Sequence, residues 1–564
     1  MAKTVQGLNL DSPFTTVKIK LEGKDIGQVT NLLDKIASFH PIFIKEYSIS
    51  PEEIYIRSKL PAIWRESEVY IQNLSSGKIK YDTALELILE KVITKRVKSM
   101  STIPILHAAH DKNIETSLAV LDKSVVEGYQ LGYSNMFNRY YVLGCGKGSQ
   151  ITGSIASSKD AAIAQKIQRD KWSTNTVIER LGLPLPKWQI LDSIDDIEKI
   201  WDEYEKPVVI KPTGLTGGKG VTVNLDTVEQ AKSAFKRAKE QAGIQIRSPW
   251  QTKIMIQEQV QGEDYRLLVI NGKLEIVTKR IPAFVIGDNK HTIEQLIEEM
   301  NKDPRRDVSN PTHTLKPIII DQPLKDLLKK NSLTLDSIPE KDSKIYVRNI
   351  ASMSQGGITQ DFTDNVSKEI KLLVESIAQS IHAFTLGVDV MCLDLSKPLT
   401  KDNGAILEVN TMPEAYLNLY PVLGEQRGYV ATTFVEELLK ENSCKKYVVV
   451  GQSTNDLATI LRRRRKISKE ENVGELIEDR YYINGIQINE DLERWNATEA
   501  IKCNALLDVI ILHHRDWNAV KESGLGFDHI NTLYITKDMK DEKEYIKIVK
   551  KYRRMKLIDN IKYI

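Results

Sequence analysis

The stretch GAILEVN, residues 404–410, decides the fold prediction. Its isoleucine, leucine and valine indicate a buried strand, and Glu408 and Asn410, two residues apart, then project from one face of that strand. Asp394 lies at the end of a second apolar run, VDVMCLDLS. A hairpin joining the two runs would bring three oxygen-bearing side chains together, and such ligands suit Mg²⁺. The alternative is an ordinary strand with polar residues on its solvent face.

The bulk composition describes an ordinary globular protein. The 564 residues exceed one core and predict two to four domains. A net charge of +3, from 79 basic and 76 acidic residues, gives no reason to expect binding to nucleic acid or membranes. Four dispersed cysteines form no CxxC pair, and the N-terminus MAKTVQGLNL has no apolar signal core. We therefore expect a cytoplasmic protein.

The patterns predict a mixed α/β (α+β) chain of three domains, at residues 1–155, 156–441 and 442–564. In the first, VKIKLEG alternates like a strand, and residues 28–37 and 82–97 have helical apolar spacing. Residues 144–148, GCGKG, lack the spacing of a phosphate loop, so a tight turn is the prediction there.

A glycine-rich loop follows a buried strand in EKPVVIKPTGLTGGKGVTVN. Lys211 ends the apolar run, and Gly217, Gly218 and Lys219 lie in the loop. Glycine lets backbone amides approach an anion closely, and the lysines supply positive charge. A plain hairpin turn is the alternative.

The next stretch, IMIQEQVQGEDYRLLVINGKLEIVTKRIPAFVIGD, predicts three or four strands. Asn271-Gly272 between alternating apolar runs is a strong hairpin signal. We expect Glu258 to lie beside an adenine and Asp264 to accept hydrogen bonds from a ribose.

Residues 287–345 are predicted to form an insertion with a helix at 292–301. Beyond it, Arg348 ends a strand and Gly356-Gly357 is a second possible anion loop.

Along the chain these motifs follow one another as a lysine, a glycine loop with a second lysine, acidic residues, an arginine and the set Asp394, Glu408 and Asn410. This order of motifs resembles the ATP-grasp superfamily of carboxylate–amine ligases, and most closely the cyanophycin synthetase family. The resemblance is strongest in KPTGLTGGKGVTVN, QEQVQGEDYRLLVINGK, NKDPRRD, SMSQGGITQDFTD and ILEVNTMPEAYLNLYPVLGE. It covers nearly all of residues 140–440.

The resemblance implies a role for each of these positions. Lys171 and Lys211 would contact ATP phosphates, with Gly217, Gly218 and Lys219 in a mobile loop over them. Glu258 and Asp264 would hold adenine and ribose, Arg348 would stabilise the reacting group, and Asp394, Glu408 and Asn410 would bind two Mg²⁺. Catalysis would fall to Arg348 and Lys219.

The third domain departs from that family. Cyanophycin synthetases continue into a Mur-ligase-like domain with a second ATP site. Here the loop GQSTNDL, after the strand KYVVV, lacks both the second glycine and the lysine of a phosphate loop. We therefore expect a shortened, degenerate Rossmann-type domain. The five cations of 462–466 are interpreted as a solvated helix end, and His513-His514 as structural or surface residues.

These features predict an ADP-forming carboxylate–amine ligase that makes an amide bond through an acyl phosphate and extends a peptide or amino-acid polymer. ATP and two Mg²⁺ are the expected cofactors. Arg305, Arg306 and His313 are candidates for binding the acceptor, and a surface loop is the alternative for them. The resemblance implies a dimer or tetramer. The competing hypotheses are a cyanophycin-type polymerase that joins dipeptide units and a non-catalytic nucleotide-binding scaffold.

Overall fold

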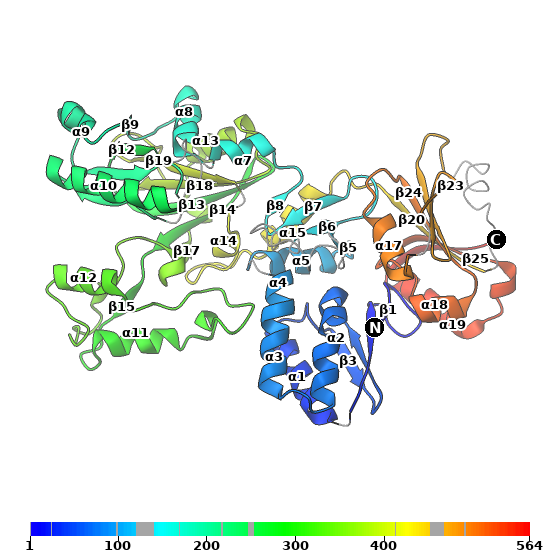
Figure 1. The fold of residues 1–564 in the computed structure, drawn as a ribbon. Coiled ribbons are helices and arrows are strands. Elements are labelled where there is room, and N and C mark those ends of the chain that lie inside the picture. The colour runs from blue at the N-terminus through cyan, green and yellow to red at the C-terminus, as the bar shows by residue number, and fades with distance from the viewer. Residues whose placement is uncertain are drawn as a thin grey trace. The chain divides into compact units, whose positions relative to one another are not determined.

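The computed structural model describes residues 2–23, 25–97, 100–119, 140–168, 170–215, 218–245, 253–411, 413–451, 467–489 and 492–564. The chain separates into two compact units (Figure 1). Unit 1 combines residues 1–154 with 431–564, and unit 2 is residues 155–430. The division of the chain into three domains stays a prediction.

The central sheet of unit 2 has five antiparallel strands. Their order is β17 (Ile358–Asp361), β14 (Lys273–Ile281), β13 (Glu263–Ile270), β18 (Thr385–Cys392) and β19 (Gly404–Thr411). The predicted turn at Asn271-Gly272 joins β13 to β14, with both residues at positive φ. Val269 and Val388 on one face share a core with Ile377 of α13 (Lys368–Ser380). The opposite face carries polar side chains.

A second sheet in unit 2 has the order β11 (Thr222–Leu225), β10 (Val208–Pro212), β12 (Ile254–Glu258) and β9 (Trp188–Leu191). Ile210 and Ile256 face a core shared with Ala234 of α10 (Val228–Gln245), which lies against this sheet (Figure 1). The helices α7 (Ala162–Gln168) and α8 (Lys171–Arg180) precede the sheet along the chain, and α9 (Asp196–Ile200) follows β9.

The predicted insertion forms a small subdomain. Its helices α11 (Ile293–Asn301) and α12 (Gln322–Lys330) share an apolar core with β15 (Phe284–Ile286). That strand pairs with β16 (Lys344–Tyr346). Thr292 caps α11, and the Gln295 side chain returns a hydrogen bond to the Thr292 backbone. The helix predicted at 292–301 is confirmed.

The N-terminal part of unit 1 places four antiparallel strands beside helices. The strand order is β1 (Lys3–Val5), β2 (Thr16–Lys20), β4 (Glu53–Arg57) and β3 (Glu46–Ile49). The helices are α1 (Ile26–Phe39), α2 (Pro61–Ser75), α3 (Tyr81–Leu87), α4 (Thr94–Arg96) and α5 (Thr102–Asp111). A π-helical segment, Ile88–Ile93, connects α3 to α4, so the helical stretch expected at 82–97 is confirmed with one irregularity. Three short strands follow: β5 (Thr116–Leu118), β6 (Tyr141–Leu143) and β7 (Gln150–Gly153).

The C-terminal part of unit 1 contains a seven-stranded sheet. The order is β23 (Ile486–Asn489), β22 (Arg480–Ile483), β21 (Val473–Ile477), β24 (Val509–His514), β20 (Lys445–Val450), β25 (Ile530–Ile535) and β26 (Ile558–Tyr563). Within this sheet the five neighbouring strands β21, β24, β20, β25 and β26 are parallel, in agreement with the expected Rossmann-type architecture. The covering helices include α17 (Arg494–Lys502), α18 (Trp517–Ser523) and α19 (Lys543–Arg554). The loop residues 452–457 and the cations 462–466 lie outside the described residues.

Candidate functional site

Two lysines and a glutamate meet between the two sheets of unit 2. Lys171 is the first residue of α8, and its Nζ lies 3.3 Å from Oε1 of Glu408 and 2.6 Å from the Leu215 carbonyl oxygen. Burial and, to a smaller extent, nearby Lys171 lower the pKa of Lys211 from 10.5 to about 8, and Glu408 partly opposes this shift. The structure therefore brings together three residues that the sequence predicted for one site.

Asp389 stands directly opposite Glu408 in the pairing of β18 with β19. Its carboxylate accepts from Arg266 on β13, and its Oδ2 lies 3.0 Å from Nη2 of Arg280 on β14. Burial disfavours the charged carboxylate, but the two arginines outweigh this effect and lower the pKa of Asp389. Sequence reasoning missed Asp389, although it precedes Asp394 in the same quoted run.

The strand register pairs Asp389, and not Asp394, with Glu408, so the role of Asp394 as a metal ligand stays a prediction. Asp394 lies beyond the end of β18, five residues past Asp389, which corresponds to a separation on the order of 15 Å along an extended strand. Its carboxylate accepts from the Ser396 amide and hydroxyl and pairs with Lys397 at 3.0 Å. These contacts lower the pKa of Asp394 to about 2 and identify it as a turn-stabilising residue.

Asn410 lies on the same strand face as Glu408 and opposite Gly387. Its Nδ2 is buried and has no hydrogen-bond partner among the described residues. The side chains of Asp389, Glu408 and Asn410 thus place oxygen atoms on one face, and these ligand types fit Mg²⁺, although Arg266 and Arg280 engage both oxygens of Asp389 in this structure.

Glu258 lies on the face of its sheet that is opposite to Lys211. Strand pairing aligns Lys211 with Met255, so the alternation of side chains places Gln257 with Lys211 and Glu258 with the core residue Ile256. Glu258 accepts from the Glu205 amide at 3.2 Å. Gln257 is buried, and its Oε1 has no partner among the described residues. The alternation along IMIQEQ was the available signal for Gln257.

Asp264 lies on the polar face of the five-stranded sheet, where its Oδ1 accepts from Arg280 Nη2 at 2.6 Å. Burial raises the pKa of Asp264, with Arg280 opposing the rise and Asp389 adding to it. The Asp264 carboxylate is therefore already paired with Arg280.

The glycine loop is described only in part. Gly217 lies outside the described residues. Gly218 has φ +75°, and a β-carbon there would stand 3.7 Å from the Ile350 side chain. Lys219 is exposed at the tip. Gly218 and Lys219 are thus both exposed to solvent, as is required of a loop that covers a ligand.

Arg348 is buried within the insertion subdomain. It pairs with Asp321 at 2.6 Å and donates to the Ile319 carbonyl oxygen. The second predicted anion loop is wrong in its chemistry, because the amides of Gly356 and Gly357 donate to the Met353 and Ser352 carbonyls. Those amides are committed to the turn.

The three acceptor candidates all make local contacts. Arg305 pairs with Asp303 at 2.7 Å. Arg306 is buried and donates to backbone carbonyls, including that of Gly356 at 3.1 Å. His313 contacts the Lys316 ammonium group at 2.6 Å. Arg306 is thus a structural link between the insertion and the sheet.

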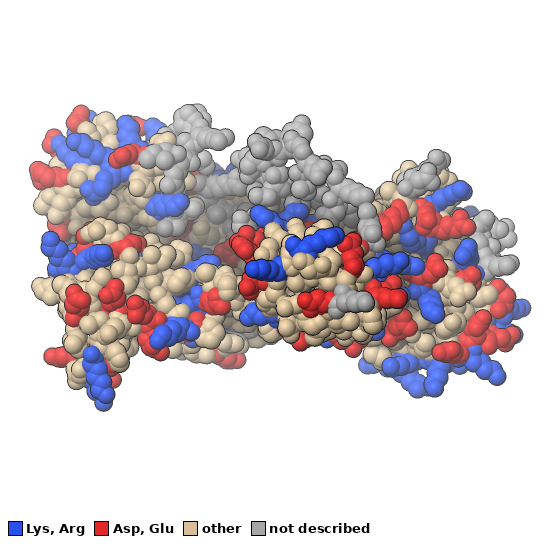
Figure 2. Space-filling model, turned by 60° about the horizontal axis from the view of Figure 1, so that its bottom comes forward, with Lys and Arg blue, Asp and Glu red and all other residues tan. Residues whose placement is uncertain are grey.

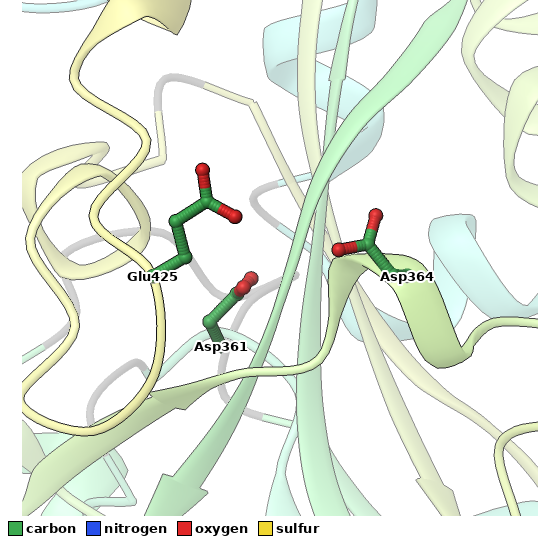
Figure 3. A group of neighbouring side chains, drawn as sticks. All are labelled: Asp361, Asp364 and Glu425. Carbon is green, nitrogen blue, oxygen red and sulfur yellow. The ribbon is translucent and has the colours of Figure 1, made fainter.

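One acidic group resembles a metal site in outline. Asp361, Asp364 and Glu425 lie with carboxylate oxygens within 4.8 Å of one another (Figure 3). Arg427 pairs with all three, at 2.9, 2.6 and 3.4 Å respectively. The shared contact with Arg427 explains how three carboxylates can lie this close together.

On the face drawn in Figure 2, basic and acidic side chains of the described residues are interspersed, and no large patch of them carries charges of one sign only. Among the described helices, none combines the length and apolarity that crossing a bilayer would take.

Comparison with known families defines the class of this site. Residues 169–284 match the family model described as phosphoribosylglycinamide synthetase, ATP-grasp (A) domain. That range contains Lys171, Lys211, the glycine loop and Gln257. Unit 2 therefore contains an ATP-grasp domain.

Individual relatives give a narrower likeness. The chain is 34% identical to the cyanophycin synthetase of Synechocystis sp. over 391 residues, which are 68% of this chain and 44% of that protein. Identity to the Crocosphaera subtropica cyanophycin synthetase is 31% over the same shares. The glutathione biosynthesis bifunctional protein GshAB of Clostridium perfringens is 28% identical over 56% of this chain and 40% of its own.

The chain is thus cyanophycin synthetase-like. It spans less than half the length of the curated relatives it matches.

Proposed function

We propose that the protein is an ATP-dependent carboxylate–amine ligase that forms an amide bond and releases ADP and phosphate. The observation that carries this proposal is one polar sheet face on which Asp389 stands opposite Glu408, with Lys171 at 3.3 Å from Glu408. This arrangement combines positive charge for phosphates with oxygen ligands for a divalent cation.

Each residue on this face has a proposed task. Lys171 and Lys211 bind ATP phosphates, and Asp389, Glu408 and Asn410 hold Mg²⁺. Bound magnesium would offset phosphate charge and orient the γ-phosphoryl group. Asp389 takes the place expected for Asp394, because the strand register sets it beside Glu408.

The adenine end is proposed to use Gln257 in place of Glu258. The buried, unpartnered Oε1 of Gln257 accepts a hydrogen bond from the adenine amino group, and its position shares a sheet face with Lys211. Asp264 binds the ribose only if Arg280 releases it, so we assign Asp264 to positioning Arg280 and Asp389.

The reaction proceeds in two steps. A substrate carboxylate attacks the γ-phosphorus of ATP, which gives an acyl phosphate and ADP. An amine then attacks the acyl carbon and displaces phosphate, with loss of one proton from nitrogen. Lys219, carried on the exposed loop, closes over the phosphates and limits hydrolysis of the intermediate.

The substrates are proposed to be an amino acid or peptide carboxylate and an amino-acid or dipeptide amine, by analogy with cyanophycin synthetases and glutathione biosynthesis enzymes. The test is ADP release with a panel of amino acids and short peptides, with products identified by mass spectrometry. Glu408→Gln should abolish ADP release without loss of fold. Magnesium-dependent turnover that survives in this variant would refute the proposal.

Two alternatives predict different products. A cyanophycin-type polymerase would give a ladder of masses spaced by one dipeptide unit, whereas single addition gives one new mass. A non-catalytic scaffold would bind ATP and release no ADP under any condition of the panel.

A further inference from the structure

A large cavity in unit 1 lies at the carboxyl end of the parallel sheet. It has a volume of about 940 Å³ and opens beside Gly451 after β20, His513 and His514 at the end of β24, and Glu475 on β21. Ligands of open α/β sheets bind in this crevice. The volume is in the range of sites for small organic molecules.

The cavity contains a partly buried positive charge, Arg494, that forms no ion pair among the described residues. The Arg494 guanidinium donates to the backbone carbonyl oxygens of His513, at 2.9 Å, and Glu478. None of the described carboxylates forms an ion pair with it. Burial lowers the pKa of Arg494 to about 10, although Asp479 and Glu478 oppose this shift. A ligand carboxylate would supply the missing counter-charge.

The first turn of α17 adds to this positive pole. Arg494 is the first residue of α17, and the helix has no side-chain cap at Glu493. Uncapped amides at a helix N-terminus favour an anion.

Two buried histidines line the same cavity with unused nitrogens. His513 is 6% exposed and His514 is 3% exposed, and His513 Nδ1 and His514 Nε2 have no partner among the described residues. His513 Nε2 lies 3.2 Å from Glu475 Oε1, and the tautomer that donates there leaves Nδ1 as an acceptor. Burial, with Arg494 and His513 nearby, keeps the pKa of His514 well below its ordinary value, so His514 is neutral.

The cavity therefore offers a carboxylate pole and an ammonium pole. The acceptor nitrogen of His513 and the Glu475 carboxylate suit a ligand N–H donor, whereas Arg494 suits an oxygen anion; Glu478 and Asp479 line the cavity as well. The same carboxylates disfavour a phosphate, because it carries up to two negative charges.

We propose that this cavity binds a small zwitterion, either a free α-amino acid or a short peptide. Its carboxylate binds at Arg494 and the first turn of α17. Its ammonium group lies toward His513 and Glu475. The proposal concerns unit 1 and does not depend on the function proposed for unit 2.

The test is isothermal titration calorimetry of the full chain with individual amino acids and dipeptides, in the absence of nucleotide. We expect at least one of them to bind saturably, and Arg494→Gln to weaken binding by about tenfold or more. The matched control is Arg554→Gln, an exposed cation of α19 that does not line the cavity, and it should leave the affinity unchanged.

His514→Leu provides a second variant that is safe for folding. Leucine removes a buried, unpartnered nitrogen, so this variant should melt at the same or a higher temperature. It should nevertheless bind the amino acid more weakly, because His514 Nε2 lines the cavity and would no longer be there to hydrogen-bond the ligand. Glu408→Gln, in unit 2, should retain the binding, which separates this cavity from the proposed ligase site.

Three results would overturn the proposal. The first is that no amino acid or dipeptide binds at millimolar concentration. The second is unchanged affinity in folded Arg494→Gln and His514→Leu variants. The third is that inorganic phosphate or an ATP analogue binds with the same dependence on Arg494 and His514.

Discussion

The pair Asp389 and Asp394 gives the sharpest comparison between two single side chains. Both are aspartates of one quoted run, but only Asp389 stands opposite Glu408. We predict that Asp389→Asn lowers magnesium-dependent ATP turnover by about a hundredfold or more, because a carboxylate ligand and the partner of two arginines are lost together. Asp394→Asn should keep turnover near that of the unmodified protein.

Steady-state ADP release measures both variants, and thermal melting checks that each is folded. Equal loss of activity in Asp389→Asn and Asp394→Asn would argue against the register-based assignment.

Lys211 gives a prediction on pH. Its folded pKa of about 8 lies below its ordinary 10.5, and ATP phosphates favour the charged form. ATP binding near pH 8 should therefore take up a proton, and affinity should fall as pH rises above 8. In the free protein the unfolded chain holds more protons between pH 8 and 10.5, so this group makes unfolding less favourable as pH rises through that window.

Calorimetry in buffers of different ionisation enthalpy measures the proton uptake directly. Lys211→Met should bind ATP weakly and show no such uptake near pH 8. Uptake that persists in this variant would assign the proton to another group.

Helix α8 connects local capping to the site. Asp170 caps α8, accepting from the Ser173 amide at 3.1 Å, and the next residue is Lys171. Asp170→Ala should cost about 1 kcal/mol of stability through loss of the cap. It should also weaken ATP binding, because the frayed first turn no longer fixes Lys171 against Glu408.

Ser367→Ala is the matched control for this prediction. Ser367 caps α13 by accepting from the Ile370 amide at 3.1 Å, and α13 carries no proposed ligand of ATP. It should lose similar stability and keep its ATP affinity. Chemical denaturation and nucleotide titration measure the two effects, and a parallel loss of affinity in both variants would contradict the reasoning.

Strand identity was predictable here, whereas strand register was not. The apolar runs and the Asn271-Gly272 turn predicted β13, β14, β18 and β19 from local pattern alone. Which aspartate faces Glu408 depends on the length of the loop between β18 and β19, and no local pattern encodes it.

The difficulty of predicting which face of a strand a residue occupies also explains why the sequence analysis placed Glu258, and not Gln257, beside the adenine. Side chains alternate along a strand, so an error of one residue moves a prediction to the opposite face of the sheet. Lys171 and Glu408 were assigned to one site only because the resemblance to ATP-grasp ligases supplied long-range information that spacing lacks, and the structure places their side chains 3.3 Å apart.

Across the full chain, the two units predict different responses to truncation. Leu8 and Leu10 share a core with Val448 and Ile510 of the C-terminal sheet, and the Leu8 amide donates to the Phe527 carbonyl at 2.8 Å. Removing residues 442–564 should therefore unfold residues 1–154. The separate cores of unit 2 should preserve ATP binding.

Limited proteolysis and circular dichroism report the loss in unit 1, and nucleotide titration reports the state of unit 2. Loss of ATP affinity with an intact N-terminal region would be the opposite of this expectation.

The number of nucleotide sites is a further prediction for the intact chain. GQSTNDL offers neither the glycine amides nor the lysine of a phosphate loop, so titration with a non-hydrolysable ATP analogue should saturate at one nucleotide per chain. A second saturable site in the Lys211→Met, Glu408→Gln double variant would restore the two-site hypothesis.

The assembly of unit 1 from both flanks of unit 2 has a consequence for biosynthesis. A ribosome delivers residues 155–430 completely before it delivers the strands that cover Leu8 and Leu10. Unit 2 can reach its native state during translation, but the N-terminal segment must wait with apolar side chains uncovered for several hundred residues. We therefore expect the nascent N-terminal segment to keep Leu8 and Leu10 exposed until the C-terminal strands have been synthesised.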